Sequence, residues 1–118
     1  MKQYLGVKLV KAEPASRGEY PGYFVQYPEG YSSWSPKASF EEAYRQIDGM
    51  PFGLALEALR KGFKVRCKGW PEGRHLEFAD ATEYKFPYIR EVYASGGNNM
   101  WLAPQIDLLA EDWMIILE

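Results

Sequence analysis

Apolar and polar residues follow a readable pattern from the first residues of the chain. Residues Lys2 to Lys11 alternate, with Leu5, Val7 and Leu9 on one side, and this period of two predicts a strand. The segment Glu13 to Gly22 contains Pro, Ser, Arg and Gly and indicates a loop. Two more short strands, Tyr23 to Tyr27 and Tyr31 to Trp34, flank a Pro-Glu-Gly turn and predict a hairpin.

A first helix is expected directly after the hairpin. Ser35 can cap it with Pro36 at the first helical position, where the missing N–H costs nothing; Ser39 with Glu42 offers a second start, one turn later. The apolar positions of this helix share one face. They are Phe40, Ala43, Tyr44 and Ile47.

The clearest helix covers Phe52 to Lys61, because apolar residues recur there at helical spacing and Gly62 can end it. Strands and one short helix fill the remainder in no regular alternation, which favours antiparallel α+β over parallel α/β. The fold class predicted is therefore α+β: an antiparallel sheet with two main helices and a short C-terminal helix. The further strands are Phe63 to Cys67, His75 to Phe78, Pro87 to Val92, Met100 to Leu102 and Trp113 to Leu117, and the short helix is Pro104 to Ala110.

The break at Asp48 to Pro51 divides the chain. Residues 1–48 then form a hairpin-helix extension that is too short to make a core easily, so we expect it to pack on residues 49–118.

With 118 residues, 47% hydrophobic and 25% charged, the chain has the composition of a globular protein. Its 16% aromatic content favours binding, because Tyr and Trp combine a large apolar body with a polar tip.

The net charge and the sequence of the first residues indicate which kinds of partner the protein can have. The net charge is −2 and no Lys/Arg block stands out, so binding to a nucleic acid polymer is disfavoured, while a small anionic ligand is not. We find no signal-peptide pattern and no apolar run of membrane-spanning length, which predicts a cytosolic protein without a membrane partner.

Residues for catalysis or metal binding are scarce. His75 is the only His and Cys67 the only Cys, so a zinc site of three or four N/S ligands is disfavoured. A nucleophilic Cys67–His75 pair is conceivable, but a small core residue is the simpler interpretation of Cys67. Asp107, Glu111 and Asp112 match no known cation-binding loop, and helix capping by Asp112 explains them better. We expect no catalytic residue, no metal and no cofactor.

Aromatic and amide side chains collect at the predicted turns. Trp70, Asn98, Asn99 and Trp101 lie there, and Arg66 and Lys68 precede Trp70, whereas Trp113 is expected to cover the core. A flat ring beside cations suits a nucleotide, with the ring on the base and the cations on the phosphate. Core packing of these tryptophans is the alternative.

Three segments together resemble a known family. They read PFGLALEALRKGFKVRCKGW (Pro51 to Trp70), PYI (Pro87 to Ile89) and MWLAPQIDLLAEDWMII (Met100 to Ile116), and they resemble the second type of phage Thoeris anti-defence protein. The resemblance covers Pro51 to Glu118. Three positions depart from the family pattern: Pro71 stands where Asn is usual, Met100 where Pro is usual and Pro104 where Ser is usual.

The resemblance implies a function that composition does not. Such proteins bind cyclic nucleotide-derived immune signals, namely glycocyclic ADP-ribose isomers or cyclic dinucleotides, without cleaving them. They assemble as homo-oligomers, expected here as a tetramer in the host cytoplasm. The alternatives left open are a phage accessory protein that binds another protein through its Tyr-rich hairpin and, third, a small hydrolase using Cys67 and His75.

The same resemblance assigns roles to single residues. Trp70 is expected to stack on a base, Arg66 to face phosphates, and Asp107 to accept hydrogen bonds from ribose or base. Asn98 or Asn99 is expected to supply an amide beside the ligand. Trp101, from the cluster of aromatic residues at the turns, is the remaining expected ligand-binding residue.

Overall fold

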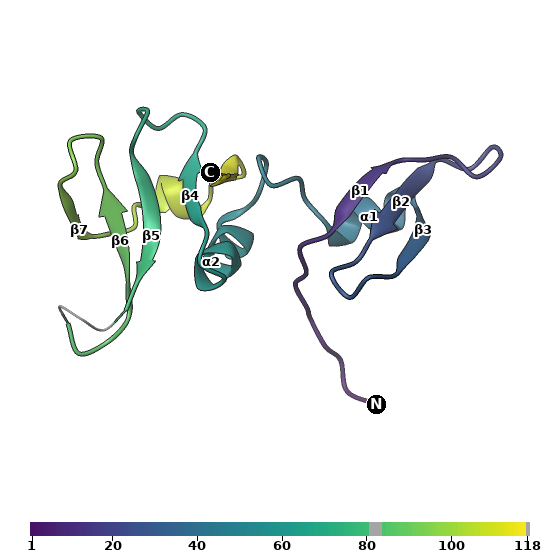
Figure 1. Ribbon diagram of the computed structural model, residues 1–118, viewed down its shortest axis with the longest axis horizontal. Helices are drawn as coiled ribbons and strands as arrows, with labels where there is room; N and C mark the ends of the chain where they lie inside the picture. Colours follow the sequence, from purple (N-terminus) through teal and green to yellow (C-terminus); the bar gives the residue numbers. More distant parts are fainter. Residues whose placement is uncertain (81–83, 118) are drawn as a thin grey trace. The chain divides into compact units, whose positions relative to one another are not determined.

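The computed structural model describes residues 1–80 and 84–117, and these form two compact units that meet in the sequence between Arg45 and Gln46 (Figure 1). The division lies between Arg45 and Gln46, whereas the sequence pattern places it after Asp48. Packing of the first unit on the second stays a prediction. The α+β class is confirmed, with two main helices and a short third one, and the antiparallel strands are shared between two sheets.

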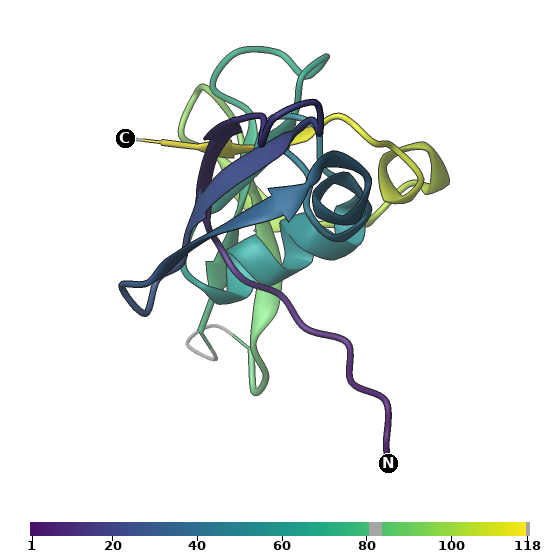
Figure 2. The same ribbon diagram turned by 90° about the vertical axis from the view of Figure 1, so that its right-hand side faces the viewer.

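The first unit is a three-stranded antiparallel sheet with one helix. The predicted hairpin is confirmed: β2 pairs with β3 so that Phe24 lies opposite Trp34. Helix α1 packs against both strands, and Figure 2 shows it nearly end-on beside them. The ring of Phe40 stacks on Tyr23 at 4.4 Å and on Tyr44 at 4.8 Å. The elements are β1 (Lys11–Pro14), β2 (Gly22–Gln26), β3 (Ser32–Pro36) and α1 (Lys37–Ala43).

The strand predicted over Lys2 to Lys11 is wrong. Residues 1–10 have no regular structure, and β1 lies instead in Lys11–Pro14, partly within the expected loop. The pairing register gives the reason: Lys11 lies opposite Gln26, and β2 ends there. Since β2 then turns away, no strand among the described residues offers backbone partners to the residues before Lys11, and alternation alone does not make a strand.

The start of α1 also differs from the prediction. Pro36 is the N-cap residue, in extended conformation, and no side chain caps the helix. The Ser35 hydroxyl makes only a long contact, 3.4 Å, with the carbonyl of Pro36. The helix ends at Ala43, so Ile47 of the predicted apolar face packs instead in the second unit.

The second unit is a five-stranded antiparallel sheet with two helices. Its strand order is β7-β6-β5-β4-β8, so the last strand returns to pair with β4. On its other side Trp113 exchanges two backbone hydrogen bonds with Met50, of 2.9 and 3.0 Å. The elements are α2 (Phe52–Arg60), β4 (Lys64–Cys67), β5 (His75–Ala79), β6 (Tyr88–Val92), β7 (Asn98–Met100), α3 (Gln105–Leu108) and β8 (Trp113–Ile116).

Helix α2 closes the core of this unit. It buries Ala55, Ala58 and Leu59, and it ends where Gly62 adopts a φ of +95°, as predicted. The helix packs against β4, β5 and β8. Within the described part of the chain, no helix is both long and apolar enough to cross a membrane.

Candidate functional site

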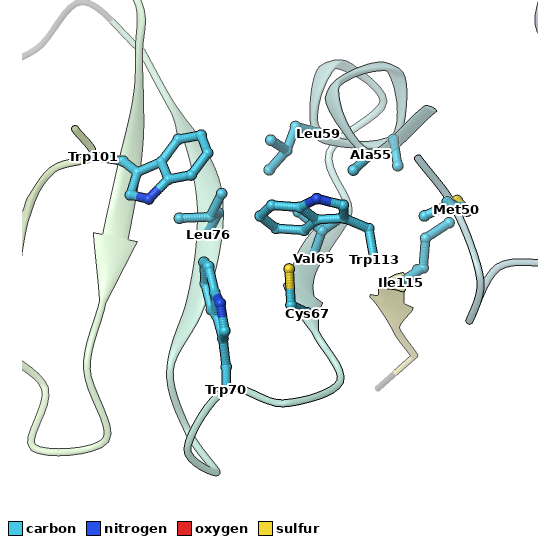
Figure 3. Packing of buried hydrophobic residues seen from close by; sticks show 11 residues of the cluster. Met50, Ala55, Leu59, Val65, Cys67, Trp70, Leu76, Trp101, Trp113 and Ile115 are labelled. Carbon is cyan, nitrogen blue, oxygen red and sulfur yellow. The ribbon is translucent and has the colours of Figure 1, made fainter. Parts of the chain in front are cut away.

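Three tryptophans form the centre of the second unit. The ring of Trp113 is fully buried, and Trp70 and Trp101 meet it edge-on with ring centroids at 5.2 and 5.9 Å (Figure 3). Leu76 and Cys67 lie beside the same rings, and Phe52 contacts both Trp101 and Trp113. Trp113 is a core residue as predicted, but it lies at the centre of the core and does not cover it. Trp70 and Trp101 belong to that core as well, with only 9% and 8% of their surface exposed.

Two of the predicted site residues, Trp70 and Asp107, contact Trp113, and Arg66 is linked to Trp70 through the backbone. The indole N–H of Trp113 donates to the backbone carbonyl of Asp107 at 2.8 Å, while Trp70 touches the same indole from another side. Arg66 donates through Nη2 to the carbonyl of Trp70 and through Nε to that of Cys67 at 3.3 Å. The structure therefore brings the backbone of Asp107 close to the turn that contains Arg66 and Trp70, although Asp107 is far from both in sequence.

Arg66 keeps its charge free of carboxylates. In β4 it alternates with buried Val65 and Cys67, so its side chain leaves the strand on the face away from the core. No carboxylate in the described residues lies within ion-pair distance of its guanidinium, which is hydrogen-bonded to backbone carbonyls only. The Lys68 amine, in contrast, lies 4.0 Å from Asp48 and is exposed. Arg66 is thus the better placed of the two for an anion.

A polar network begins at the face of Trp70. The Arg74 guanidinium lies 4.0 Å from the centroid of the Trp70 ring and donates through Nε to Glu91 at 2.6 Å. The Tyr93 hydroxyl donates to the other Glu91 oxygen at 3.0 Å, and Asn99 donates its amide to Tyr93 at 3.1 Å. Asn99 is thereby linked to Trp70 through three intervening side chains.

The sequence reasoning missed Arg74, Glu91 and Tyr93. One signal was available: Glu91 shares a face of β6 with Ile89, which packs on the core. An acidic residue on an inward-facing strand position requires a buried partner. Glu91 is 7% exposed, and Arg74 supplies that partner.

The register of β7 separates the two asparagines. Asn99 lies opposite Glu91 and Asn98 opposite Val92, so their side chains leave opposite faces of the sheet. Only Asn99 joins the network that starts at Trp70. Of the two alternatives in the sequence, the structure therefore places Asn99 on the side of Trp70 and Arg74.

Trp101 has one unusual feature. Its indole N–H is buried and has no hydrogen-bond partner among the described residues, whereas the indole of Trp113 is satisfied by Asp107. A buried donor without an acceptor is costly, on the order of 1–3 kcal/mol. Trp101 therefore carries unused hydrogen-bonding capacity inside the tryptophan cluster.

Comparison with known proteins decides the family. Residues 50–116 match the Thoeris anti-defense 2-like domain, which is more than half of the chain. The chain is also 34% identical over 85 residues to "Thoeris anti-defense 2" of Bacillus phage SP01, an alignment that covers 57% of this chain and 94% of that protein. The chain belongs to the Thoeris anti-defense 2-like family. An anti-defence role is the function that this membership supports.

The family domain coincides with the second unit and leaves the first outside the match. Two of the departures from the family pattern lie at a turn or at the start of a helix. The Pro71 carbonyl accepts the backbone N–H of Arg74 at 3.1 Å, and Pro104 is the N-cap residue of α3.

The structure contradicts a Cys67–His75 nucleophile pair. Cys67 faces the core with 4% exposure, whereas His75 precedes inward-facing Leu76 and so leaves β5 on the opposite face. The His75 ring contacts the carbonyl of Gly73 at 3.1 Å and Glu77 at 3.8 Å. Burial, reinforced by the carboxylates of Asp112 and Asp107, raises the pKa of the Cys67 thiol to about 12. The small-core-residue interpretation of Cys67 is confirmed.

This pKa predicts how Cys67 reacts. An unfolded thiol ionises near pH ~8.5, so between that pH and about 12 the unfolded chain forms thiolate while the folded chain does not. Native protein at pH 9 should therefore react with iodoacetamide far more slowly than protein in urea, and its stability should fall as pH rises through this window. Equal labelling rates in both states would contradict the burial of Cys67.

Carboxylates near the C-terminus do not assemble with other ligands. No group of three or more His, Cys, Asp or Glu side chains among the described residues is arranged to hold a metal ion. The side chain of Asp112 is placed next to Cys67 rather than at the cap of α3, whose start has no side-chain cap.

Proposed function

We propose that this chain sequesters a cyclic nucleotide-derived immune signal, a glycocyclic ADP-ribose isomer or a cyclic dinucleotide, and thereby blocks bacterial anti-phage defence. It acts in the host cytoplasm as a homotetramer and releases the ligand unchanged. Family membership supports the anti-defence part of the proposal. The observation that carries the ligand part is the guanidinium of Arg66, which has no carboxylate partner among the described residues and donates to the carbonyl of Trp70, the residue whose ring packs with Asp107 on Trp113.

Each of these residues offers the chemistry that such a ligand needs. Arg66 has a guanidinium without a carboxylate partner in the described chain, and it can bind phosphate oxygens in a bidentate manner. The half-buried Asp107 can accept hydrogen bonds from ribose hydroxyls or a base amine. Because a carboxylate repels phosphate, Asp107 faces the ribose or base end of the ligand.

Trp70 acts together with Arg74 in this proposal. The Arg74 guanidinium covers one face of the Trp70 ring, so a base that approaches from that side stacks on Arg74 or displaces it. Asn99 offers an amide at the far end of the same network, and Asn98 lies on the other sheet face. The unsatisfied indole N–H of Trp101 is a further donor in the same cluster.

Release of the ligand unchanged agrees with a Cys67 thiol that stays protonated. A thiol whose pKa lies near 12 stays protonated at neutral pH and is a poor nucleophile.

A homo-oligomer makes physical sense because a small domain has little concave surface, and a symmetric interface can form a pocket from two chains.

The test is capture followed by release. The protein is incubated with glycocyclic ADP-ribose isomers and cyclic dinucleotides, separated from free ligand, heated, and the supernatant is resolved by chromatography. We expect at least one signal to be depleted before heating and recovered unchanged after it. A chemically altered product would indicate an enzyme, and no depletion of any ligand would contradict the proposal.

Light scattering on the same sample should give the mass of four chains, and the mass of one chain at micromolar concentration would contradict the assembly.

A further inference from the structure

The first unit contains an open groove of about 680 Å³ that lies outside the family match. Its walls are aromatic and proline side chains with charged groups among them. The residues that matter most are Arg17, Tyr20, Pro21, Trp34, Pro36 and Lys37. A volume in this range is typical of ligand sites.

The groove is held in shape by local hydrogen bonds. Arg17 and Tyr20 exchange backbone hydrogen bonds of 2.8 and 3.0 Å across a tight turn, in which Gly18 has a φ of +61°. The Trp34 indole N–H donates to the carbonyl of Ala15 at 2.6 Å. The aromatic walls are therefore positioned before any ligand arrives, which lowers the entropy cost of binding.

The Trp34 ring is already covered. The Arg17 guanidinium lies 4.7 Å from its centroid, and the backbone of Gly22 is so close that a Cβ there would lie 2.5 Å from the ring. Stacking of a nucleobase needs an open ring face and would first have to displace Arg17. Proline rings and aliphatic side chains need no such face and pack against ring edges and against the exposed ring of Tyr20, which is 71% accessible.

The charges in the groove select for acidic ligands. Among the described residues no carboxylate lies within ion-pair distance of Arg17 or Lys37. The one carboxylate in the wall, Glu41, accepts a hydrogen bond from the Tyr23 hydroxyl at 2.5 Å. Two cations thus face one engaged carboxylate, and a ligand with negative groups is favoured.

We propose that this groove binds an extended, proline-containing, acidic peptide segment of another protein. Proline-rich segments prefer the extended polyproline II conformation, so they lose little entropy when they dock in aromatic-lined grooves. The open shape suits a chain that enters and leaves, whereas a small molecule would keep much of its surface in water. The site is independent of the sequestration proposed for the second unit.

The test uses full-length ¹⁵N-labelled protein. Trp34 is the only tryptophan in residues 1–45, and its indole resonance is identified by Trp34→Phe. A short peptide of alternating proline and glutamate should shift this resonance saturably. Matched peptides of proline with lysine and of alanine with glutamate should bind at least about 10-fold more weakly, because they lack the charge or the rigid backbone.

Variants separate binding from folding. Tyr20→Ala and the double variant Arg17→Ala/Lys37→Ala should each weaken the proline–glutamate peptide about 10-fold or more, and Tyr20→Ala should leave the melting temperature unchanged because Tyr20 is exposed. Arg60→Ala, an exposed cation of α2, should leave binding unchanged. The proposal is overturned if no peptide shifts the resonance at millimolar concentration, if the lysine peptide binds equally well, or if AMP shifts it and the acidic peptide does not.

Discussion

Replacement of Trp113 by alanine is expected to destabilise the second unit by about 3–5 kcal/mol, the range for loss of a buried Trp side chain. Trp113 is fully buried and contacts Phe52, Trp70 and Trp101, so the substitution leaves a large cavity at the centre of the core. Native domains are stable by only ~5–15 kcal/mol, which places this variant near its unfolding threshold. Urea titration followed by ¹H–¹⁵N spectra measures the change in residues 46–117.

A conservative variant isolates the hydrogen bond. Trp113→Phe keeps an aromatic ring but removes the N–H that donates to the Asp107 carbonyl. We expect a smaller loss than for alanine, with the resonances of α3 (Gln105–Leu108) affected most. An alanine variant with the urea midpoint of the native chain would show that Trp113 is not the centre of this core.

Arg66→Ala should weaken binding of the captured signal by about 10- to 100-fold. A hydrogen bond to a charged group is worth ~1.5–3 kcal/mol, and Arg66 is proposed to meet the phosphates. Titration calorimetry with the ligand recovered in the capture experiment measures the change. Because Arg66 is half-buried and its partners are backbone carbonyls, thermal melting is recorded for the same variant.

Arg60→Ala provides the matched control for charge. It removes one positive charge from the same unit, at an exposed position on α2, and should change affinity less than threefold at physiological salt. Equal losses for Arg60→Ala and Arg66→Ala would indicate only a general electrostatic attraction. If Arg66→Ala lowers the melting temperature strongly and weakens binding to a similar extent, the loss of affinity reflects a loss of folding, and Arg66 has only a structural role.

Residues with a local signal were predicted well. Helix α2 has apolar residues at helical spacing and a glycine at its end, and both are properties of the sequence itself. The β2–β3 hairpin follows from a turn between two short strands, for the same reason. The tail from Met100 to Ile116 carries enough of the family pattern to identify the family from sequence alone.

Residues whose state depends on a distant partner were not predictable in this way. Lys2 to Val10 alternate like a strand, yet in the described part of the chain no strand pairs with them, because β2 ends opposite Lys11. Trp70 and Trp101 have the appearance of exposed turn aromatics, yet both pack on Trp113, which follows them by many residues. Burial is decided by the whole fold, not by neighbours in sequence.

The sequence by itself therefore determined the α+β class, the main helices and the family of this protein, because these depend on local periodicity and on a linear pattern. Only the tertiary structure decided that Asn99 rather than Asn98 joins the hydrogen-bond network at Trp70, since the pairing of β6 with β7 sets which side chain faces Glu91. It also decided that Arg74 covers Trp70 and that Cys67 is separated from His75. The position of Asn99 and the separation of Cys67 from His75 depend on strand register, and a shift of one residue would reverse the face of every side chain on the strand.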